Sequence, residues 1–141
     1  MKVAALTLIL TGLFTLALAG TAASENAPPS SPAPSAAQTM KGQFRWTQAD
    51  EVGELQASFT PTGAASWNVS FRFEFRGPHT YTGTAAGTLA EGSQLSGEVQ
   101  DEKGRRHWKF AGTFKNGRLD GEHFELRGGE QERSGTLTLF R

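Results

Sequence analysis

The stretch WNVSFRFEF, residues 67–75, alternates apolar and polar side chains without a break. Its apolar set is Trp67, Val69, Phe71, Phe73 and Phe75. A period of two places such a set on one face of a β-strand, whereas a helix would repeat about every 3.6 residues. The stretch therefore predicts a strand with a buried aromatic face.

The same alternation recurs on both sides of this strand and divides the chain into eight segments. Turn signals such as Gly77-Pro78 and Asn116-Gly117 separate them, and Asn-Gly is typical of a tight hairpin turn. Because every connection is short, neighbouring segments are expected to pair antiparallel as a meander. The other seven segments cover residues 42–46, 53–59, 81–89, 95–99, 108–114, 119–126 and 135–139.

The predicted fold class is all-β, an antiparallel meander of about eight strands. We expect the meander to close into a small up-and-down β-barrel, and a β-sandwich is the alternative. In architecture the expected barrel resembles lipocalin-like and avidin-like proteins, which are compact meanders with an aromatic interior. This resemblance concerns the fold alone.

Residues 1–23 have the pattern of a secretory signal peptide. Lys2 precedes an apolar run at 3–19, and small residues follow it. The alternative is a single membrane anchor, because the run borders on spanning length. The pattern predicts an exported protein, periplasmic or extracellular, that leaves the membrane after cleavage.

Residues 24–40 contain four of the six prolines, together with serine and alanine, and are predicted to form a flexible linker. Residues 41–141 are then a single all-β domain. The chain has no cysteine, so packing alone must hold this domain together. Fourteen basic residues balance fourteen acidic ones, which argues against a nucleic-acid partner.

Glycines recur on the predicted inner face: Gly83, Gly87, Gly97, Gly112 and Gly121. Glycine inside a strand packs nothing, so three explanations compete. The glycines bend the wall of a barrel, make room for facing rings, or border a cavity. Around Gly77-Pro78 we expect Phe75 opposite Tyr81 and Phe73 over Gly83, and further on Leu89 opposite Leu95.

In the segment 119–126 the alternation of inward and outward residues is interrupted, because Phe124 follows Gly121 by three positions instead of two. A β-bulge near Glu122-His123 would absorb the extra residue. Phe110 would then face Phe124, and Lys109 would lie on the outer face between Glu98 and Glu125.

The sequence contains no recognisable catalytic or metal motif. The three histidines, His79, His107 and His123, lack the spacing of a zinc site, although His123 is the best single candidate for a role. No nucleophile elbow or phosphate loop occurs. We therefore expect a non-enzymatic protein without a metal or cofactor.

The predicted function is that of an exported β-barrel domain that binds a small apolar molecule or an unknown protein partner. Two alternatives stay open: a sealed structural or interaction domain without a ligand, and a small outer-membrane β-barrel. The candidate ligand-binding residues of the interior are Trp67, Phe71, Phe73, Phe75, Tyr81, Trp108 and Phe110.

Overall fold

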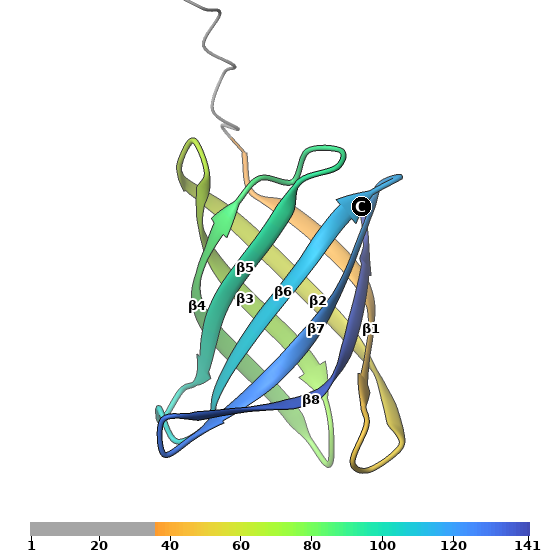
Figure 1. The fold of residues 1–141 in the computed structure, drawn as a ribbon, viewed down its shortest axis with the longest axis vertical. Helices are drawn as coiled ribbons and strands as arrows, with labels where there is room; N and C mark the ends of the chain where they lie inside the picture. The colour runs from red at the N-terminus through yellow and green to blue at the C-terminus, as the bar shows by residue number, and fades with distance from the viewer. Residues whose placement is uncertain (1–35) are drawn as a thin grey trace, which may run out of the picture. The chain divides into compact units, whose positions relative to one another are not determined.

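The computed structural model describes residues 36–141 as a closed barrel of eight antiparallel strands (Figure 1). Each strand pairs with its neighbour in sequence, and β8 returns to pair with β1 from Lys41↔Phe140 to Trp46↔Gly135. The strands are β1 (Gln38–Trp46), β2 (Glu51–Gly63), β3 (Ser66–Glu74), β4 (Pro78–Gly87), β5 (Gln94–Asp101), β6 (His107–Lys115), β7 (Arg118–Arg127) and β8 (Glu130–Phe140). The predicted barrel is confirmed, and the sandwich alternative is wrong because the sheet has no open edge.

The predicted signal peptide, 1–23, lies outside the described residues, as does the linker up to residue 35. β1 begins at Gln38, before the expected domain start at Lys41, and Met40 is fully buried in the core. Within residues 36–141, no helix is long and apolar enough to cross a bilayer.

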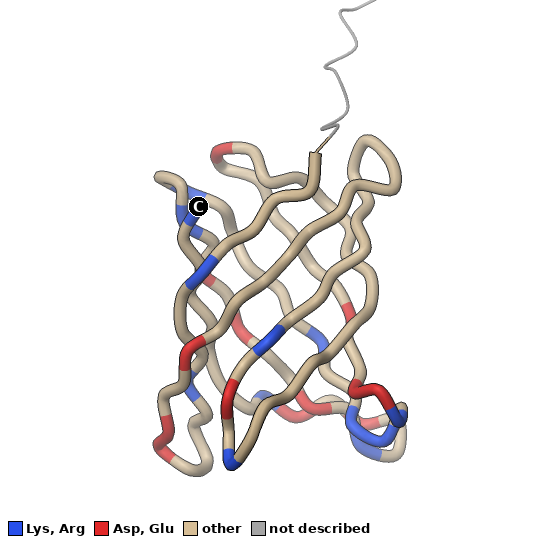
Figure 2. Tube along the Cα trace, turned by 180° about the vertical axis from the view of Figure 1, so that it is seen from behind, with Lys and Arg blue, Asp and Glu red and all other residues tan. Residues whose placement is uncertain are grey.

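The inner face of the barrel carries the apolar side chains that the alternation predicted. The outer face carries threonines and charged residues of both signs. Figure 2 shows basic and acidic residues on many strands, with more of them toward the lower end of the view. An outer-membrane barrel needs the opposite arrangement, with an apolar outer band. The buried core consists of Met40, Phe44, Leu55, Ala57, Phe59, Trp67, Val69, Phe71, Tyr81, Ala85, Leu89, Leu95, Val99, Trp108, Phe110, Phe114, Leu119, Leu137 and Leu139.

At the inward glycines the backbone of the neighbouring strand leaves no room for a side chain. A Cβ at Gly83 would overlap the Glu98 carbonyl oxygen of the neighbouring strand, so the two backbones approach too closely for any side chain. At Gly97 the close backbone and the room needed by a ring both act, since a Cβ there would overlap the Thr84 carbonyl oxygen and lie 2.7 Å from Phe110 Cε1. The expected pair of Phe73 over Gly83 is wrong, because Gly83 faces Val69.

The β-bulge lies in β8, not in β7 as predicted. β6 and β7 stay in register, with Phe110 opposite His123. On the other side of β7, His123 faces Gly135 but Phe124 faces Arg133, which leaves Ser134 as the extra residue. A parity change shows that a residue is extra, but not which of two paired strands contains it.

This correction reverses the predicted inner face of β7 from His123 onward, whereas Leu119 and Gly121 point inward as predicted. Glu125 lies opposite Trp108 on the inner side and is 7% exposed, whereas Phe124 lies opposite Lys109 on the outer side. Lys109 therefore pairs with Glu98 alone, at 3.1 Å, and Glu125 accepts from Arg127 instead, at 2.7 Å.

Two hairpin registers also differ from prediction. Phe71, not Phe75, faces Tyr81, because Arg76 adopts a left-handed φ of 54° and centres the turn there rather than at Pro78. Leu95 faces Gly87, not Leu89. Both shifts are even numbers of residues, so the inward sets are unchanged.

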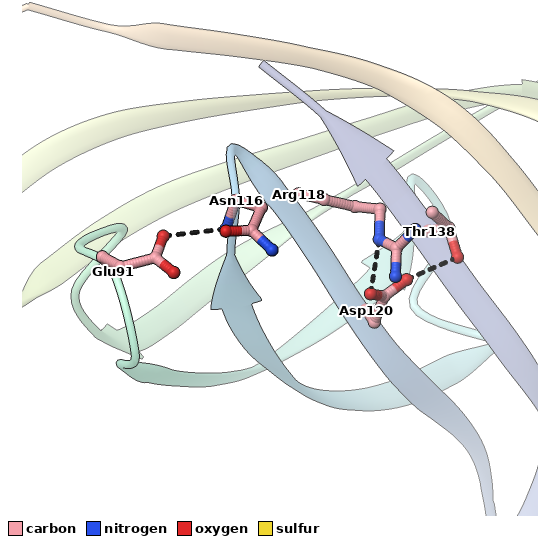
Figure 3. A network of polar contacts seen from close by, with 5 residues as sticks. All are labelled: Glu91, Asn116, Arg118, Asp120 and Thr138. Carbon is pink, nitrogen blue, oxygen red and sulfur yellow. Dashed lines mark hydrogen bonds and ion pairs between the residues drawn. The ribbon is translucent and has the colours of Figure 1, made fainter.

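The end of the barrel that contains loops 88–93 and 116–117, here called the closed end, is covered. Leu89 of the long loop is buried, and the Arg141 Nη2 donates to its carbonyl oxygen at 3.0 Å. The Asn116 backbone N–H donates to Glu91 Oε2 at 2.8 Å, which ties this loop to the β6–β7 hairpin (Figure 3). Beside it Asp120 joins Arg118 to Thr138, at 2.6 and 3.0 Å.

Candidate functional site

The opposite end, with loops 47–50, 75–77, 102–106 and 128–129, is here called the open end. A cavity of about 70 Å³ lies inside it and opens to solvent. Six of the seven candidate residues line this cavity: Phe71, Phe73, Phe75, Tyr81, Trp108 and Phe110. The structure thus brings most of the predicted set into one place.

The cavity wall consists of aromatic rings in contact with one another. Phe73 packs edge-on against Phe44 and Tyr81, with centroids 5.2 and 5.1 Å apart. Trp46 packs edge-on against Trp108 at 5.5 Å. Such contacts add about 0.5–1.5 kcal/mol per pair beyond area burial, so the rings of the wall support one another.

Trp67 does not belong to this cavity. It lies in the half of the barrel near the closed end and is 1% exposed. Its Nε1–H donates to the Gly87 carbonyl oxygen at 2.9 Å, and its ring packs edge-on against Phe59 at 6.3 Å. Because its one donor is already used, Trp67 contributes to packing.

Several lining residues were not among the candidates: Phe44, Trp46, Leu55, His79, Arg106, Lys109, His123 and Leu137. The inward parity of Phe44 and Trp46 was visible in the sequence. Their nearness to β3 and β6 was not, because it depends on closure of the sheet. Arg106 belongs to the basic run 103–106, whose sequence is typical of a solvent-exposed turn.

The indole N–H of Trp108 donates no hydrogen bond. The side chain is 8% exposed, and its Nε1 is buried with no hydrogen-bond partner. The Tyr81 hydroxyl is near, but the two groups do not have hydrogen-bond geometry. Burial raises the pKa of Tyr81, and the positive charge of Arg106 partly offsets that rise.

A turn anchored on Asp101 positions Arg106. The Asp101 Oδ1 accepts from the backbone N–H groups of Arg105 and Arg106, at 2.6 and 3.0 Å. The bond from Arg106 is the main reason that the pKa of Asp101 lies below its usual value. The Arg106 side chain lines the cavity, and none of the five ion pairs within residues 36–141 includes it.

His123 holds the seam between β8 and β1. Its Nε2 lies 3.0 Å from the Arg45 carbonyl oxygen, and its Nδ1 lies 3.0 Å from Ser134 Oγ. A carbonyl only accepts, so the neutral ring donates from Nε2 and accepts from the Ser134 hydroxyl at Nδ1. Burial lowers the pKa of His123, which favours this neutral form.

We expect His123→Gln to remove part of the acid sensitivity of the fold. Because the folded pKa is lowered, the unfolded chain binds the proton more readily, and stability falls as the pH drops below about 6.5. Urea unfolding between about pH 7.5 and about pH 5.5 should show a smaller loss in the variant. An equal loss in both proteins would contradict the assignment to His123.

Within the described residues, no group of three histidine, cysteine or carboxylate side chains is placed to hold a metal ion.

The Ser134 hydroxyl that contacts His123 is buried and also lies 3.1 Å from the His123 carbonyl oxygen. The single proton of this hydroxyl is donated either to Nδ1 or to the carbonyl oxygen, and both contacts join β7 to β8. The Nε2 contact with the Arg45 carbonyl oxygen joins β7 to β1.

Comparison of the chain with protein-family models, curated proteins and solved structures found no match.

Proposed function

We propose that the barrel binds a small apolar molecule in the cavity of the open end. The observation that carries the proposal is a solvent-open aromatic cavity whose wall includes Trp108, a residue with a buried, unpaired indole N–H. A concave apolar site with a few placed polar groups is typical of small-molecule binding. The occupied hydrogen bonds of His123 support binding without catalysis.

The size of the cavity limits the ligand. Its volume of about 70 Å³ is below the roughly 150 Å³ of an engineered cavity that accepts benzene. A single ring or the end of a short alkyl chain would therefore enter with some widening of the wall. The remainder of the molecule would lie at the mouth, beside Trp46 and Phe75.

A protein partner has less support. Among residues 36–141 the exposed large apolar side chains are Val52 and Phe140. Val52 is the second residue of β2, at the open end, and Phe140 ends β8 at the closed end, so they form no common patch. Extended apolar patches are the usual mark of such an interface.

Toluene titration followed by ¹⁵N–¹H NMR tests the proposal. We expect the indole signal of Trp108 to shift while that of Trp67, which is bonded to Gly87, stays in place. Leu137→Phe should weaken binding at least about tenfold, because the added ring fills the cavity. Val52→Phe adds the same ring on the outside and should leave binding unchanged.

Absence of any saturable shift in the unmodified protein would contradict ligand binding and favour the sealed domain. Equal weakening by Leu137→Phe and Val52→Phe would show that toluene binds elsewhere. Circular dichroism of both variants checks that the strands are retained.

A further inference from the structure

We propose that the ligand of the open-end cavity carries a carboxylate, which Arg106 and the Trp108 indole N–H receive. The inference rests on the proposed function and specifies the chemical class of the molecule: a small aromatic or alkyl chain with one anionic end. Three observations on the cavity wall support it.

The first observation is the unpaired indole of Trp108. An indole N–H is only a donor, and a buried donor without an acceptor costs about 1–3 kcal/mol. Nearly all buried polar groups in proteins have a partner. Here the Nε1 has none among the described residues, and Trp108 itself lines the cavity. The Nε1 atom is buried, so an acceptor reaches it only as the wall widens around the ligand. An oxygen acceptor on the ligand would provide the missing bond.

The second observation is the charge of Arg106 at the same wall. Its guanidinium has no carboxylate within 4.0 Å among residues 36–141, yet its backbone is fixed by Asp101. The planar fork of arginine matches a carboxylate with two parallel hydrogen bonds. The effect of Arg106 on the pKa of Tyr81 places this charge beside the cavity.

The third observation is that neighbouring groups are already paired or lie outside the cavity. Lys109 is bound to Glu98, and Glu125 is bound to Arg127. His79 stacks on Phe73 at 5.2 Å, and its Nε2 lies 2.8 Å from the Phe75 carbonyl oxygen. Arg106 is therefore the cationic side chain of the wall that has no carboxylate partner.

A cationic ligand is the competing class, because aromatic rings also attract cations. The Glu51 Oε2 is buried without a partner and would be its counter-charge. Glu51 does not line the cavity, whereas Trp108 and Arg106 both do. Both residues that carry donors thus belong to the cavity wall and Glu51 does not, which favours the anion.

Three probes of nearly equal shape separate these cases: benzoate, neutral benzamide and cationic benzamidine. Each is titrated into the purified protein and followed through the indole signal of Trp108. We expect benzoate to bind at least about tenfold more tightly than benzamidine, with benzamide between them. Arg106→Gln should remove this preference. Arg105→Gln removes an equal charge from the same loop but not from the cavity wall, and should retain it.

The outcomes distinguish the two proposals. Equal affinities, or tighter binding of benzamidine, would overturn the carboxylate inference and leave the binding function in place. An Arg105→Gln effect as large as that of Arg106→Gln would also overturn it, because the preference would then reflect general charge. If neither toluene nor any of the three probes binds, the proposed function itself fails.

Discussion

Gly135→Ala should lower the free energy of unfolding by about 3 kcal/mol or more, among the largest effects of any single methyl group in this chain. A Cβ at this position would overlap the Arg45 carbonyl oxygen of β1 and would lie 2.6 Å from His123 Nε2. The backbone of β1 cannot move away without loss of the pairing that closes the barrel. Urea unfolding followed by circular dichroism measures the change.

Gly63→Ala is the matched control. Gly63 also lies in a strand, but the nearest atom to its added Cβ is the Ser66 hydroxyl oxygen, which can rotate away. Its cost should stay below about 1 kcal/mol. Similar losses in both variants would show that the β1–β8 seam is not especially tight.

Trp67→Ala should cost about 3–5 kcal/mol, the range typical of a fully buried large aromatic residue. Its ring fills the half of the barrel near the closed end, and its loss would also leave the Gly87 carbonyl oxygen without its indole donor. The midpoint of urea unfolding measures this loss. A cost below about 1 kcal/mol would mean that the closed half is loosely packed.

Trp67→Phe separates packing from binding. It keeps a ring but removes the hydrogen bond to Gly87, and should cost clearly less than Trp67→Ala. Because Trp67 does not line the cavity, this variant should bind toluene as the unmodified protein does. A large loss of toluene affinity would place the ligand deeper in the barrel than the open end.

The two halves of the interior thus have different expected roles. Near the closed end the side chains are fully buried, as Phe59 and Leu119 show, and a substitution there should change stability. Near the open end the rings of Phe73 and Phe75 are only partly buried beside the cavity, and a substitution there should change binding.

The strands and their inward faces could be predicted because each depends on local sequence. Alternation from Trp67 to Phe75 places its own side chains on one face, whichever strand lies beside it. The hairpin turn predicted at Asn116-Gly117 is likewise present, with Phe114 opposite Leu119. These features involve residues close along the chain.

The remaining features depend on residues that are far apart in sequence. The extra residue proved to be Ser134 and not a residue of β7, because the position of a bulge is a property of two paired strands. His123 reaches Arg45, 78 positions away, only because β8 closes on β1. The cavity at the open end arises in the same way, since rings from β1, β3, β4 and β6 meet there only after the tilted sheet has curved into a barrel.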